Sequence, residues 1–505
     1  MKTYLDLKDF FSKRDFKLIM AADAQTRIFM RKKDKLVLKI PAGGVSVALD
    51  PIAKASEAVY IARGKTTEKN FLRNKNETVI KDDNGKYTLK RLFLEDEELD
   101  AYYNGFSNQT LWPLCHVAFE PPIFQNDWYE GYKKVNQKFA KVIREEIDGK
   151  TFIWIHDYQL ALVPKFLSRP KDCTLGMFWH TPWPTWEIFR ILPEKKEILE
   201  SLLTCDFLAF HRGYHVRNFL ETVRRELEAR IDEETNTIYY NKQTTTVKNL
   251  PLGVDTDIIK SLLFREQEET FFGQVVTGVL GNLIKSPNNS SGLSDFFKNK
   301  KVILGVDRLD YTKGFGLRLT AIDKFLEENP EYIGSIVYVG ILAPSRESVP
   351  AYKKLKKEIK ELAQKINNKY KRKNWQPIHL VHQVFAREEI INFYKKANVC
   401  LVTPLDDGMN LVSKEFVIAA SGALNPGMIV LSQFAGSAID LTQALIVNPY
   451  NTEEVAQAIK KALKMEKEEK QRRIKEMVEN LEENNVYEWA EEFIRSAMVS
   501  SNGLP

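Results

Sequence analysis

Residues 403–415, with the sequence TPLDDGMNLVSKE, are the stretch from which the fold can be read. They follow an apolar run, 397–402, that has the length and composition of a buried strand, and they precede apolar residues 416–420, which are consistent with a helix. Asp407 and Gly408 therefore lie in a strand-to-helix connection, the place where an open α/β sheet binds ligands. The first amides of a helix have no partner within it, so they are available to a ligand beside the carboxylate.

This stretch also admits a plainer interpretation. Asp407 would then be the N-cap of the helix, and Lys414 and Glu415 would form a solvent-exposed pair. The stretch by itself does not decide between a ligand-binding loop and a capped helix.

A second strand-to-helix connection is predicted at residues 307–314, with the sequence DRLDYTKG. It follows the apolar run 302–306, and a helical pattern comes after it. The chain has neither a G-x-x-x-x-G-K-[ST] loop nor a G-x-G-x-x-G loop after a strand, so a phosphate here would be bound by helix amides and by the cations Arg308 and Lys313. The alternative is an ordinary cluster of charges on the surface.

The composition is that of a globular protein with more than one domain. A chain of 505 residues exceeds the size of one hydrophobic core, and 44% hydrophobic and 28% charged residues are ordinary values. The net charge of +6 is a small difference between 74 basic and 68 acidic residues. It suits small anionic substrates and is too weak to indicate nucleic acid as a partner.

The sequence gives no sign of membrane insertion or secretion. No apolar run approaches about 18 residues, and the charged start MKTYLDLKDFFSKRD lacks the apolar core of a signal peptide. The four cysteines form no C-x-x-C pair, so we expect buried free thiols in a reducing cytoplasm. They are Cys115, Cys173, Cys205 and Cys400.

Strand-like and helix-like segments alternate on both sides of the Pro- and Gly-bearing segment 249–255. This alternation predicts an α/β fold with two doubly wound, Rossmann-like parallel sheets facing each other. We place the two domains at residues 1–248 and 249–484. The predicted strands are 16–20, 151–155, 175–179, 302–306, 336–339, 378–381, 397–402 and 429–431.

Three further segments are predicted from local composition. Residues 104–112 are turn-rich, and residues 128–147 have the spacing of an amphipathic helix, with another helix at 160–167. Residues 286–294, with the sequence SPNNSSGLS, are expected to form a mobile loop.

The order of the motifs is more informative than any one of them. In this order the chain resembles the retaining glycosyltransferases of the trehalose-6-phosphate synthase family, which have the two-domain GT-B fold with a cleft between the domains. That resemblance implies a C-terminal helix, within 485–505, that joins the first domain. The matching segments are 42–44, 102–108, 111–113, 154–158, 180–182, 187–189, 307–314, 343–346, 407–415, 431–436 and 447–450.

The resemblance implies a site for a nucleotide-activated glucose, with UDP-glucose as the first choice and the identity of the base left open. Arg308 and Lys313 would bind its diphosphate. Glu415 would bind its ribose, and Asp407 the transferred sugar. The other donor-binding positions are Gly43, Gly44, Gly408, Met409, Asn410, Leu411 and Val412.

The resemblance also implies an acceptor site in the first domain, where Tyr103, Trp112 and Asp157 match the family. Arg346 matches a residue that contacts the acceptor's phosphate, and His180 a histidine beside the reacting sugar. Taken alone, each of these would more often be a packing aromatic, a helix cap, a surface charge or a core histidine. The predicted catalytic residues are His180, Arg308, Lys313 and Asp407.

Two departures from the family pattern fall on the acceptor half. The family has Ser-Asn-Arg after the first strand, whereas residues 19–24 read IMAADA and contain no arginine. Arg27 and Arg31 are the candidates to replace it. The Trp-rich segment that the family has after the Gly-Gly loop is replaced by YIARG at residues 60–64.

Three functions are compatible with these residues. The first is synthesis of α,α-trehalose 6-phosphate, a step toward a compatible solute, from nucleotide-glucose and glucose 6-phosphate. The second keeps the donor but uses another phosphorylated acceptor, such as the glycerol 3-phosphate of glucosylglycerol-phosphate synthases. The third is a catalytically silent sugar-phosphate sensor or scaffold. No cofactor, metal or phosphatase domain is expected, and self-association is left open.

Overall fold

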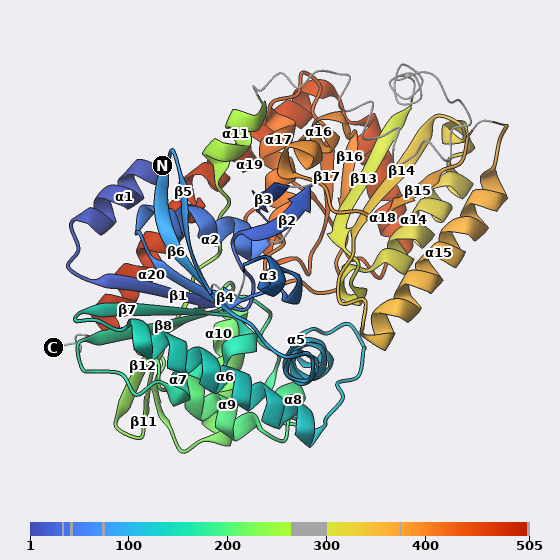
Figure 1. Ribbon diagram of the computed structural model, residues 1–505. Helices are drawn as coiled ribbons and strands as arrows, with labels where there is room; N and C mark the ends of the chain where they lie inside the picture. The colour runs from blue at the N-terminus through green and yellow to red at the C-terminus, as the bar shows by residue number, and fades with distance from the viewer. Residues whose placement is uncertain (33–34, 41–43, 73–75, 264–299, 374, 502–505) are drawn as a thin grey trace. The chain divides into compact units, whose positions relative to one another are not determined.

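The computed structural model describes residues 1–32, 35–40, 44–72, 76–263, 300–373 and 375–501, which form two compact units (Figure 1). Unit 1 comprises the described residues of Met1–Gly253 and Glu483–Pro505, and unit 2 comprises those of Val254–Glu482. Residues 286–294, predicted as a mobile loop, lie outside the described residues.

Unit 1 is built on a ten-stranded sheet with the strand order β10-β11-β12-β9-β8-β7-β1-β4-β6-β5. The strands from β12 to β6 in this order run parallel, and antiparallel strands extend both edges. A separate hairpin pairs β2 with β3. The strands are β1 Lys17–Ala22, β2 Ile28–Lys32, β3 Lys35–Lys39, β4 Val59–Arg63, β5 Glu77–Asp82, β6 Gly85–Leu92, β7 Thr151–His156, β8 Cys173–Trp179, β9 Phe207–Phe210, β10 Arg230–Asp232, β11 Thr237–Tyr240 and β12 Gln243–Asn249.

The central strands of this sheet are covered by helices, as their burial requires. Every residue of β7 is buried, which is typical of a parallel strand with both faces covered. The C-terminal helix contributes to this cover, because the Phe493 ring stacks on Trp154 with centroids 4.3 Å apart. The helices of unit 1 are α1 Tyr4–Ser12, α2 Gly44–Ala55, α3 Thr66–Phe71, α4 Asp96–Leu99, η1 Asp100–Leu111, α5 Trp112–Cys115, α6 Asn126–Glu146, η2 Tyr158–Leu160, α7 Val163–Phe166, α8 Trp186–Phe189, α9 Lys195–Leu202, α10 Gly213–Glu226 and α20 Val486–Ser501.

The prediction of turns at 104–112 is wrong, because η1 is a continuous π-helix. The Asn108 side chain donates to the Tyr103 carbonyl at 2.7 Å, and the Gln109 side chain to the Asn104 carbonyl at 2.9 Å. Residues that favour turns by composition thus satisfy the helix backbone instead. Gly105 allows close packing, because a Cβ there would lie 2.6 Å from the Trp128 ring on α6.

The helix predicted at 160–167 is interrupted. The structure has the 3₁₀ turn η2 and the short helix α7 instead. Pro164 explains the break, because it has no N–H to donate to the carbonyl of Leu160.

Unit 2 contains a six-stranded sheet in the order β15-β14-β13-β16-β17-β18, in which all pairs are parallel. Counted along this unit, the order is 3-2-1-4-5-6, the Rossmann order. Its strands are β13 Lys301–Arg308, β14 Ile336–Ala343, β15 Ile378–Val381, β16 Val399–Val402, β17 Met428–Ser432 and β18 Leu445–Val447. Its helices are α11 Thr256–Leu263, η3 Tyr311–Lys313, α14 Phe315–Glu328, η4 Pro330–Tyr332, α15 Pro350–Tyr370, α16 Arg387–Lys396, α17 Leu411–Ser421, η5 Gly436–Ile439, α18 Thr452–Lys464 and α19 Lys467–Glu483.

Near its centre, each sheet has a point from which the chain first extends to one side and later to the other. In unit 2 the chain goes from β13 to β14 on one side and returns to β16 on the other. In unit 1 the corresponding point lies between β1 and β7. Ligands of open α/β sheets bind at the carboxyl ends of the strands beside such points. The loops after β13 and β16 in unit 2, and after β1 and β7 in unit 1, are therefore the first places to examine.

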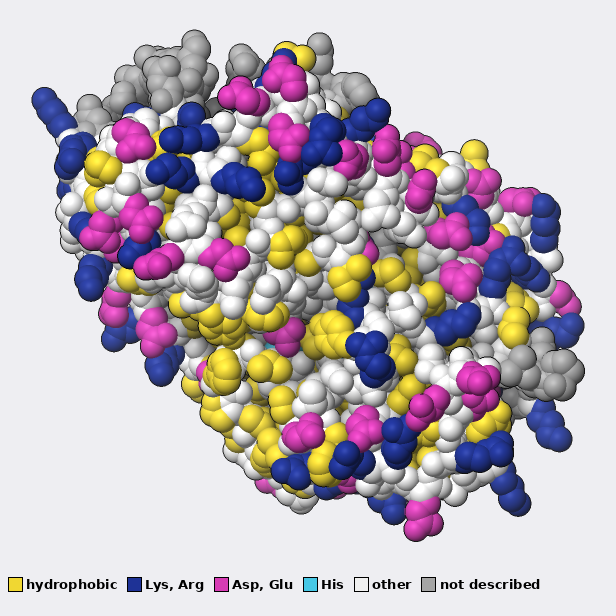
Figure 2. Space-filling view, turned by 180° about the vertical axis from the view of Figure 1, so that it is seen from behind, with side chains coloured by type: hydrophobic (Ala, Val, Ile, Leu, Met, Phe, Trp, Pro, Cys, Tyr) yellow, Lys and Arg dark blue, Asp and Glu magenta, His cyan; other side chains and the backbone are white. Residues whose placement is uncertain are grey.

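Three coarse features concern membrane spanning, the cysteines and the surface charge. No helix among the described residues is long and apolar enough to cross a membrane. All four cysteines are buried, and none of them forms a disulfide. On the face shown in Figure 2, basic and acidic side chains are interspersed with apolar ones.

Candidate active site

The loops that follow β13 and β16 contact each other at the reversal point of unit 2. The Lys313 ammonium lies 2.6 Å from the Asp407 carboxylate, and their side chains are only 10% and 15% exposed. The Leu405 amide donates to the Thr312 carbonyl at 2.7 Å, which joins the two backbones. The structure therefore places together residues from the two stretches that the sequence analysis singled out.

Arg318 was missed in the sequence analysis, and its buried side chain forms hydrogen bonds with both of these loops. Its fully buried guanidinium donates to Asp307 at 2.8 Å and to the Thr403 hydroxyl at 2.9 Å. It also donates to the carbonyl of Lys313 at 3.1 Å. A signal was present in the sequence, because an arginine on the apolar face of a predicted helix needs a buried partner.

Arg308 and Arg346 are both held near the fully buried Asp310. Arg346 donates to Asp310 at 2.9 Å, and the Arg308 guanidinium lies 3.7 Å from the same carboxylate. Burial alone would raise the pKa of Asp310, but the nearby arginines and Lys313 hold it below its ordinary value. The Arg346 side chain is 3% exposed, so the alternative of an ordinary surface charge is wrong for this residue.

The N-cap of α17 is Asn410, and not Asp407 as the plainer interpretation required. The Asn410 side chain accepts from the Ser413 amide at 3.0 Å and donates to Asp407 at 2.9 Å. Asp407 is thus left to face Lys313. The neighbouring loop comes close, because a Cβ on Gly436 would lie 2.0 Å from the carbonyl oxygen of Gly408.

The side chains around Glu415 also differ from the plainer interpretation. Glu415 accepts from Arg387 of α16 at 3.1 Å. Lys414 is buried and pairs with Asp440 at 2.8 Å, so these neighbours are not a solvent-exposed pair. The other predicted donor positions here, Met409, Leu411 and Val412, lie around the start of α17, and Leu411 and Val412 pack partly buried against the core.

In unit 1, three charged residues follow one row of paired residues across β4, β1 and β7. Ala22 is paired with Ala62 on one side and with His156 on the other. Arg63, Asp23 and Asp157 come directly after these three residues. With about 4.8 Å between neighbouring strands, Arg63 and Asp157 lie on either side of Asp23 at the carboxyl edge of the sheet.

Asp157 has a strained backbone with φ of 72°. Its side chain makes no capping hydrogen bond to the helix that follows, and it accepts from the His180 amide at 3.0 Å. The alternative of a helix cap is therefore wrong here. Arg346 and Asn410 also have positive φ, at 48° and 73°. Such strain costs about 1–3 kcal/mol per residue and clusters at functional sites.

His180 is buried beside a second histidine that the sequence analysis did not name. His180 Nε2 lies 3.1 Å from His156 Nδ1, and the two rings are stacked. Burial lowers the pKa of His180 to about 3, so its ring is neutral at physiological pH. Burial lowers the pKa of His156 as well, and the neighbouring His180 ring lowers it further, because two adjacent histidines disfavour a proton on either.

This burial predicts acid sensitivity. An unfolded histidine titrates near about 6.5, so below that pH the unfolded chain binds protons that the folded chain refuses. Above about pH 6.5 the buried neutral His180 therefore costs no free energy of unfolding, and below it the free energy of unfolding falls steadily toward pH 3. Between pH 7 and pH 5 we expect a loss of about 2 kcal/mol from His180. Urea unfolding of the wild type and His180→Asn at both pH values measures this share, and an identical pH dependence in the two proteins would contradict it.

The aromatic residues of the predicted acceptor site lie against the same sheet edge. The Arg63 guanidinium is centred 4.4 Å from the Tyr103 ring and forms two hydrogen bonds of 2.8 Å with Asp23. Trp112 packs 5.9 Å from the ring of Tyr158, the residue after Asp157. Arg63 belongs to the segment that replaces the family's tryptophans, and sequence reasoning did not assign it a role.

The remaining predicted residues of unit 1 are two arginines and the Gly-Gly pair, and only some of them lie among the described residues. Arg27 forms hydrogen bonds of 2.8 and 2.7 Å with Asp50 on α2. Gly44 begins α2, whereas Gly43 and the side chain of Arg31 lie outside what the structure describes. Among the described residues, no group of three His, Cys, Asp or Glu side chains is arranged to hold a metal ion.

Comparison with known proteins assigns these loops to a family. The sequence profile of glycosyltransferase family 20 matches residues 16–278 and 282–498. The chain belongs to glycosyltransferase family 20. It is a glycosyltransferase, as the order of its motifs predicted, and the resemblance to the trehalose-6-phosphate synthase family is confirmed.

Two relatives in this family show how far the similarity extends. The chain is 36% identical over 415 residues to the UDP-forming α,α-trehalose-phosphate synthase of Candida albicans, covering 81% of this chain and 82% of the relative. It is 35% identical over 423 residues to the 56 kDa subunit of the corresponding Saccharomyces cerevisiae protein, covering 83% and 81%.

Solved structures of similar proteins have the same fold. An E. coli structure bound with UDP-2-fluoro glucose is 30% identical, with a TM-score of 0.81 over 97% of this chain and all of the other. A UDP-forming synthase from Burkholderia xenovorans in complex with glucose 6-phosphate is 28% identical, with a TM-score of 0.80 over 95% of this chain and 100% of the other. The prediction of a GT-B fold with two Rossmann-like sheets is confirmed.

Proposed function

We propose that this protein transfers glucose from UDP-glucose to glucose 6-phosphate with retention of configuration, giving α,α-trehalose 6-phosphate and UDP. The relatives from Candida albicans and Saccharomyces cerevisiae are UDP-forming synthases of this product. The observation that carries the proposal is the pairing of Lys313 with Asp407, beside Arg308, at the reversal point of the unit 2 sheet. A fixed cation beside a carboxylate fits a sugar diphosphate, which presents anionic oxygens next to hydroxyl groups.

In the proposed reaction, the bond between the anomeric carbon and the diphosphate breaks as the acceptor oxygen bonds to the same carbon on the same face. The acceptor's proton goes to the departing diphosphate oxygen, so no protein nucleophile is needed. Negative charge grows on the diphosphate, and Lys313 and Arg308 stabilise it. Asp407 holds Lys313 at 2.6 Å before substrate arrives, so this cation does not have to be reoriented during the reaction.

The donor sugar and nucleotide are assigned to the remaining residues of these loops. Asp407 and the amides of Gly408 to Asn410 bind the sugar hydroxyls. Glu415, which accepts from Arg387, binds the ribose with its remaining oxygen lone pairs. His180, neutral because burial lowers its pKa to about 3, offers a ring nitrogen to the reacting sugar without adding charge.

The acceptor is assigned to Tyr103, Trp112 and Asp157, with Arg346 on its phosphate. Arg63 supplies a further cation in place of the arginine that the family has after the first strand. Its Nε and Nη2 donate to Asp23, and its Nη1 has no hydrogen-bond partner among the described residues. Arg27, in contrast, faces Asp50 and Asp82. A guanidinium with two nitrogens fixed and the third without a partner among the described residues is preorganised for an anion.

A substrate screen tests the proposal and its alternatives. Purified protein is incubated with UDP-, GDP- or ADP-glucose and with glucose 6-phosphate or glycerol 3-phosphate, and nucleotide release is followed. We expect the fastest release with UDP-glucose and glucose 6-phosphate. Release with glycerol 3-phosphate only would favour a glucosylglycerol-phosphate synthase, and no release with any pair would favour a silent sensor or scaffold.

Arg63→Gln tests the acceptor assignment. We expect KM for glucose 6-phosphate to rise by about tenfold to 100-fold, because a charge-assisted hydrogen bond contributes about 1.5–3 kcal/mol. KM for UDP-glucose should stay within about twofold. Arg27→Gln is the matched control, because Asp50 keeps Lys54 as a partner at 2.9 Å. An unchanged acceptor KM in Arg63→Gln would remove Arg63 from the acceptor site.

We also place the protein in the cytoplasm, which supplies both proposed substrates. Four buried cysteines without a disulfide agree with a reducing compartment. Self-association stays a prediction that gel filtration or light scattering would test.

A further inference from the structure

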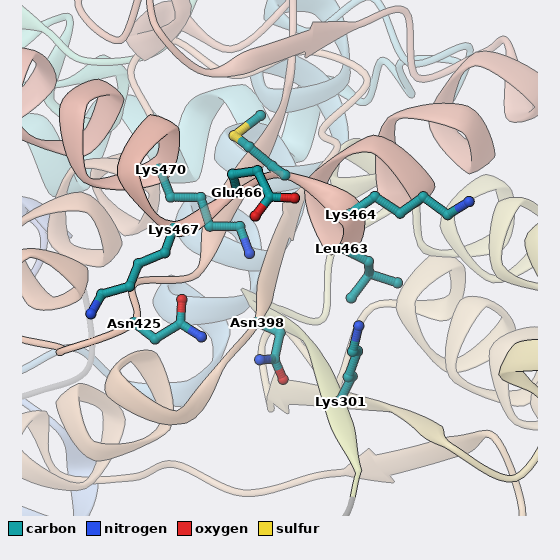
Figure 3. A pocket seen from close by; sticks show the side chains of 9 residues that line it. Lys301, Asn398, Asn425, Leu463, Lys464, Glu466, Lys467 and Lys470 are labelled. Carbon is teal, nitrogen blue, oxygen red and sulfur yellow. The ribbon is translucent and has the colours of Figure 1, made fainter.

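Unit 2 contains a hollow at the edge of the sheet opposite the candidate active site. Its volume is about 310 Å³, and it lies between the start of β13, the residue before β16 and the junction of α18 with α19 (Figure 3). The side chains that matter here are Lys301, Asn398, Asn425, Glu466, Lys467 and Lys470. We call this place the basic hollow.

Lys470 is the unusual residue of the basic hollow. It is 6% exposed, and among the described residues neither a hydrogen bond nor an ion pair reaches its ammonium group. Buried lysines are normally paired with a carboxylate, because an isolated buried charge is costly. Burial lowers the pKa of Lys470, Lys301 lowers it further, and Glu466 opposes them from beyond ion-pair distance.

The surroundings of Lys470 supply further donors. Figure 3 shows the ammonium groups of Lys470 and Lys301 turned toward the same space, whereas Lys464 and Lys467 extend away from it. Asn398 accepts from the Val302 amide at 2.7 Å through its oxygen, so its NH₂ group is left to donate elsewhere. The 17-residue helix α19 begins at Lys467, and the amides of a first helical turn favour an anion.

We propose that the basic hollow binds the phosphate group of a small metabolite, with Lys470 and Lys301 as its two cations. Two oxygens of a phosphate dianion would accept from Lys470 and Lys301 and neutralise the charges of both ammonium groups. The NH₂ group of Asn398 would donate to a third phosphate oxygen. The volume fits a small ligand.

This site is distinct from the candidate active site, and it does not depend on the proposed function. Lys301 and Arg308 are the first and last residues of β13, which at about 3.3 Å per residue separates them by roughly 23 Å. A small phosphorylated molecule cannot contact both.

Titration with inorganic phosphate at constant ionic strength tests the proposal. Isothermal calorimetry is compared between wild type, Lys470→Met, Lys301→Met and Lys475→Met. Lys475 is the matched control, because it lies on α19 with its side chain 77% exposed. Methionine keeps the length of lysine and removes the charge, so Lys470→Met should fold at least as stably as the wild type.

We expect at least tenfold weaker phosphate binding in Lys470→Met and Lys301→Met, and wild-type binding in Lys475→Met. Lys313→Ala separates this site from the candidate active site, and it should retain the same phosphate-binding component. Equal binding by Lys470→Met and the wild type would overturn the proposal, as would the absence of phosphate binding by the wild type.

Discussion

Lys313→Ala is expected to lower kcat by about two to three orders of magnitude, the loss found when one preorganised donor to a developing negative charge is removed. The variant removes the cation that lies 2.6 Å from Asp407 and leaves that carboxylate facing the space where the diphosphate would depart. Both changes oppose the growth of negative charge on the leaving group. Steady-state nucleotide release with saturating UDP-glucose and glucose 6-phosphate measures the effect.

The control for this variant is Lys354→Ala, on the surface helix α15. The Lys354 side chain is 78% exposed and lies 3.9 Å from Glu358, so its removal should leave kcat unchanged. Lys313→Arg keeps the charge and should recover part of the lost rate. A kcat within threefold of the wild type in Lys313→Ala would show that this lysine does not stabilise the leaving group.

Arg318→Met is expected to have the largest effect on stability. It leaves Asp307, now 2.8 Å from the guanidinium, as an unpaired buried carboxylate, and it removes the hydrogen bond to Thr403. Breaking a buried pair in this way costs about 3–5 kcal/mol. For a unit of this size each kcal/mol lowers the unfolding temperature by about 2–4 °C. Differential scanning calorimetry measures the shift in the transition of unit 2.

Arg472→Met provides the comparison for Arg318→Met. Arg472 lies on α19 with its side chain 51% exposed, and it pairs with Glu469 and Glu476. Surface pairs of this kind contribute about 0–1 kcal/mol, so its transition should move little. The double variant Arg318→Met with Asp307→Leu removes both buried charges and should recover much of the lost stability. Equal transitions in Arg318→Met and Arg472→Met would show that the buried pair does not hold the loops.

The sheets were predictable because buried parallel strands are short apolar runs that alternate with helices. The stretches around Arg308 and Asp407 both follow such runs, and parallel strands bring their carboxyl ends to one edge. That these two stretches lie close together could therefore be predicted from the sequence. The direct contact between Lys313 and Asp407 was not, because it depends on which strands are neighbours.

The remaining site features depend on packing that local sequence does not encode. Asn410, and not Asp407, caps α17, because Asp407 forms an ion pair with Lys313, which is distant in the sequence. Composition favoured turns at 104–112, yet side-chain amides support a π-helix there and Gly105 admits the Trp128 ring. Arg63 could be assigned only once the structure placed Asp23 and Tyr103 around it.

The central claim, retaining transfer of glucose to glucose 6-phosphate, is tested most directly by the anomeric configuration of the product. Proton NMR of a reaction with UDP-glucose and glucose 6-phosphate is predicted to show a 1,1-linked disaccharide phosphate with both anomeric centres α, formed in step with UDP. A β-configured centre, a linkage to another hydroxyl of the acceptor, or UDP released without any disaccharide would contradict the claim.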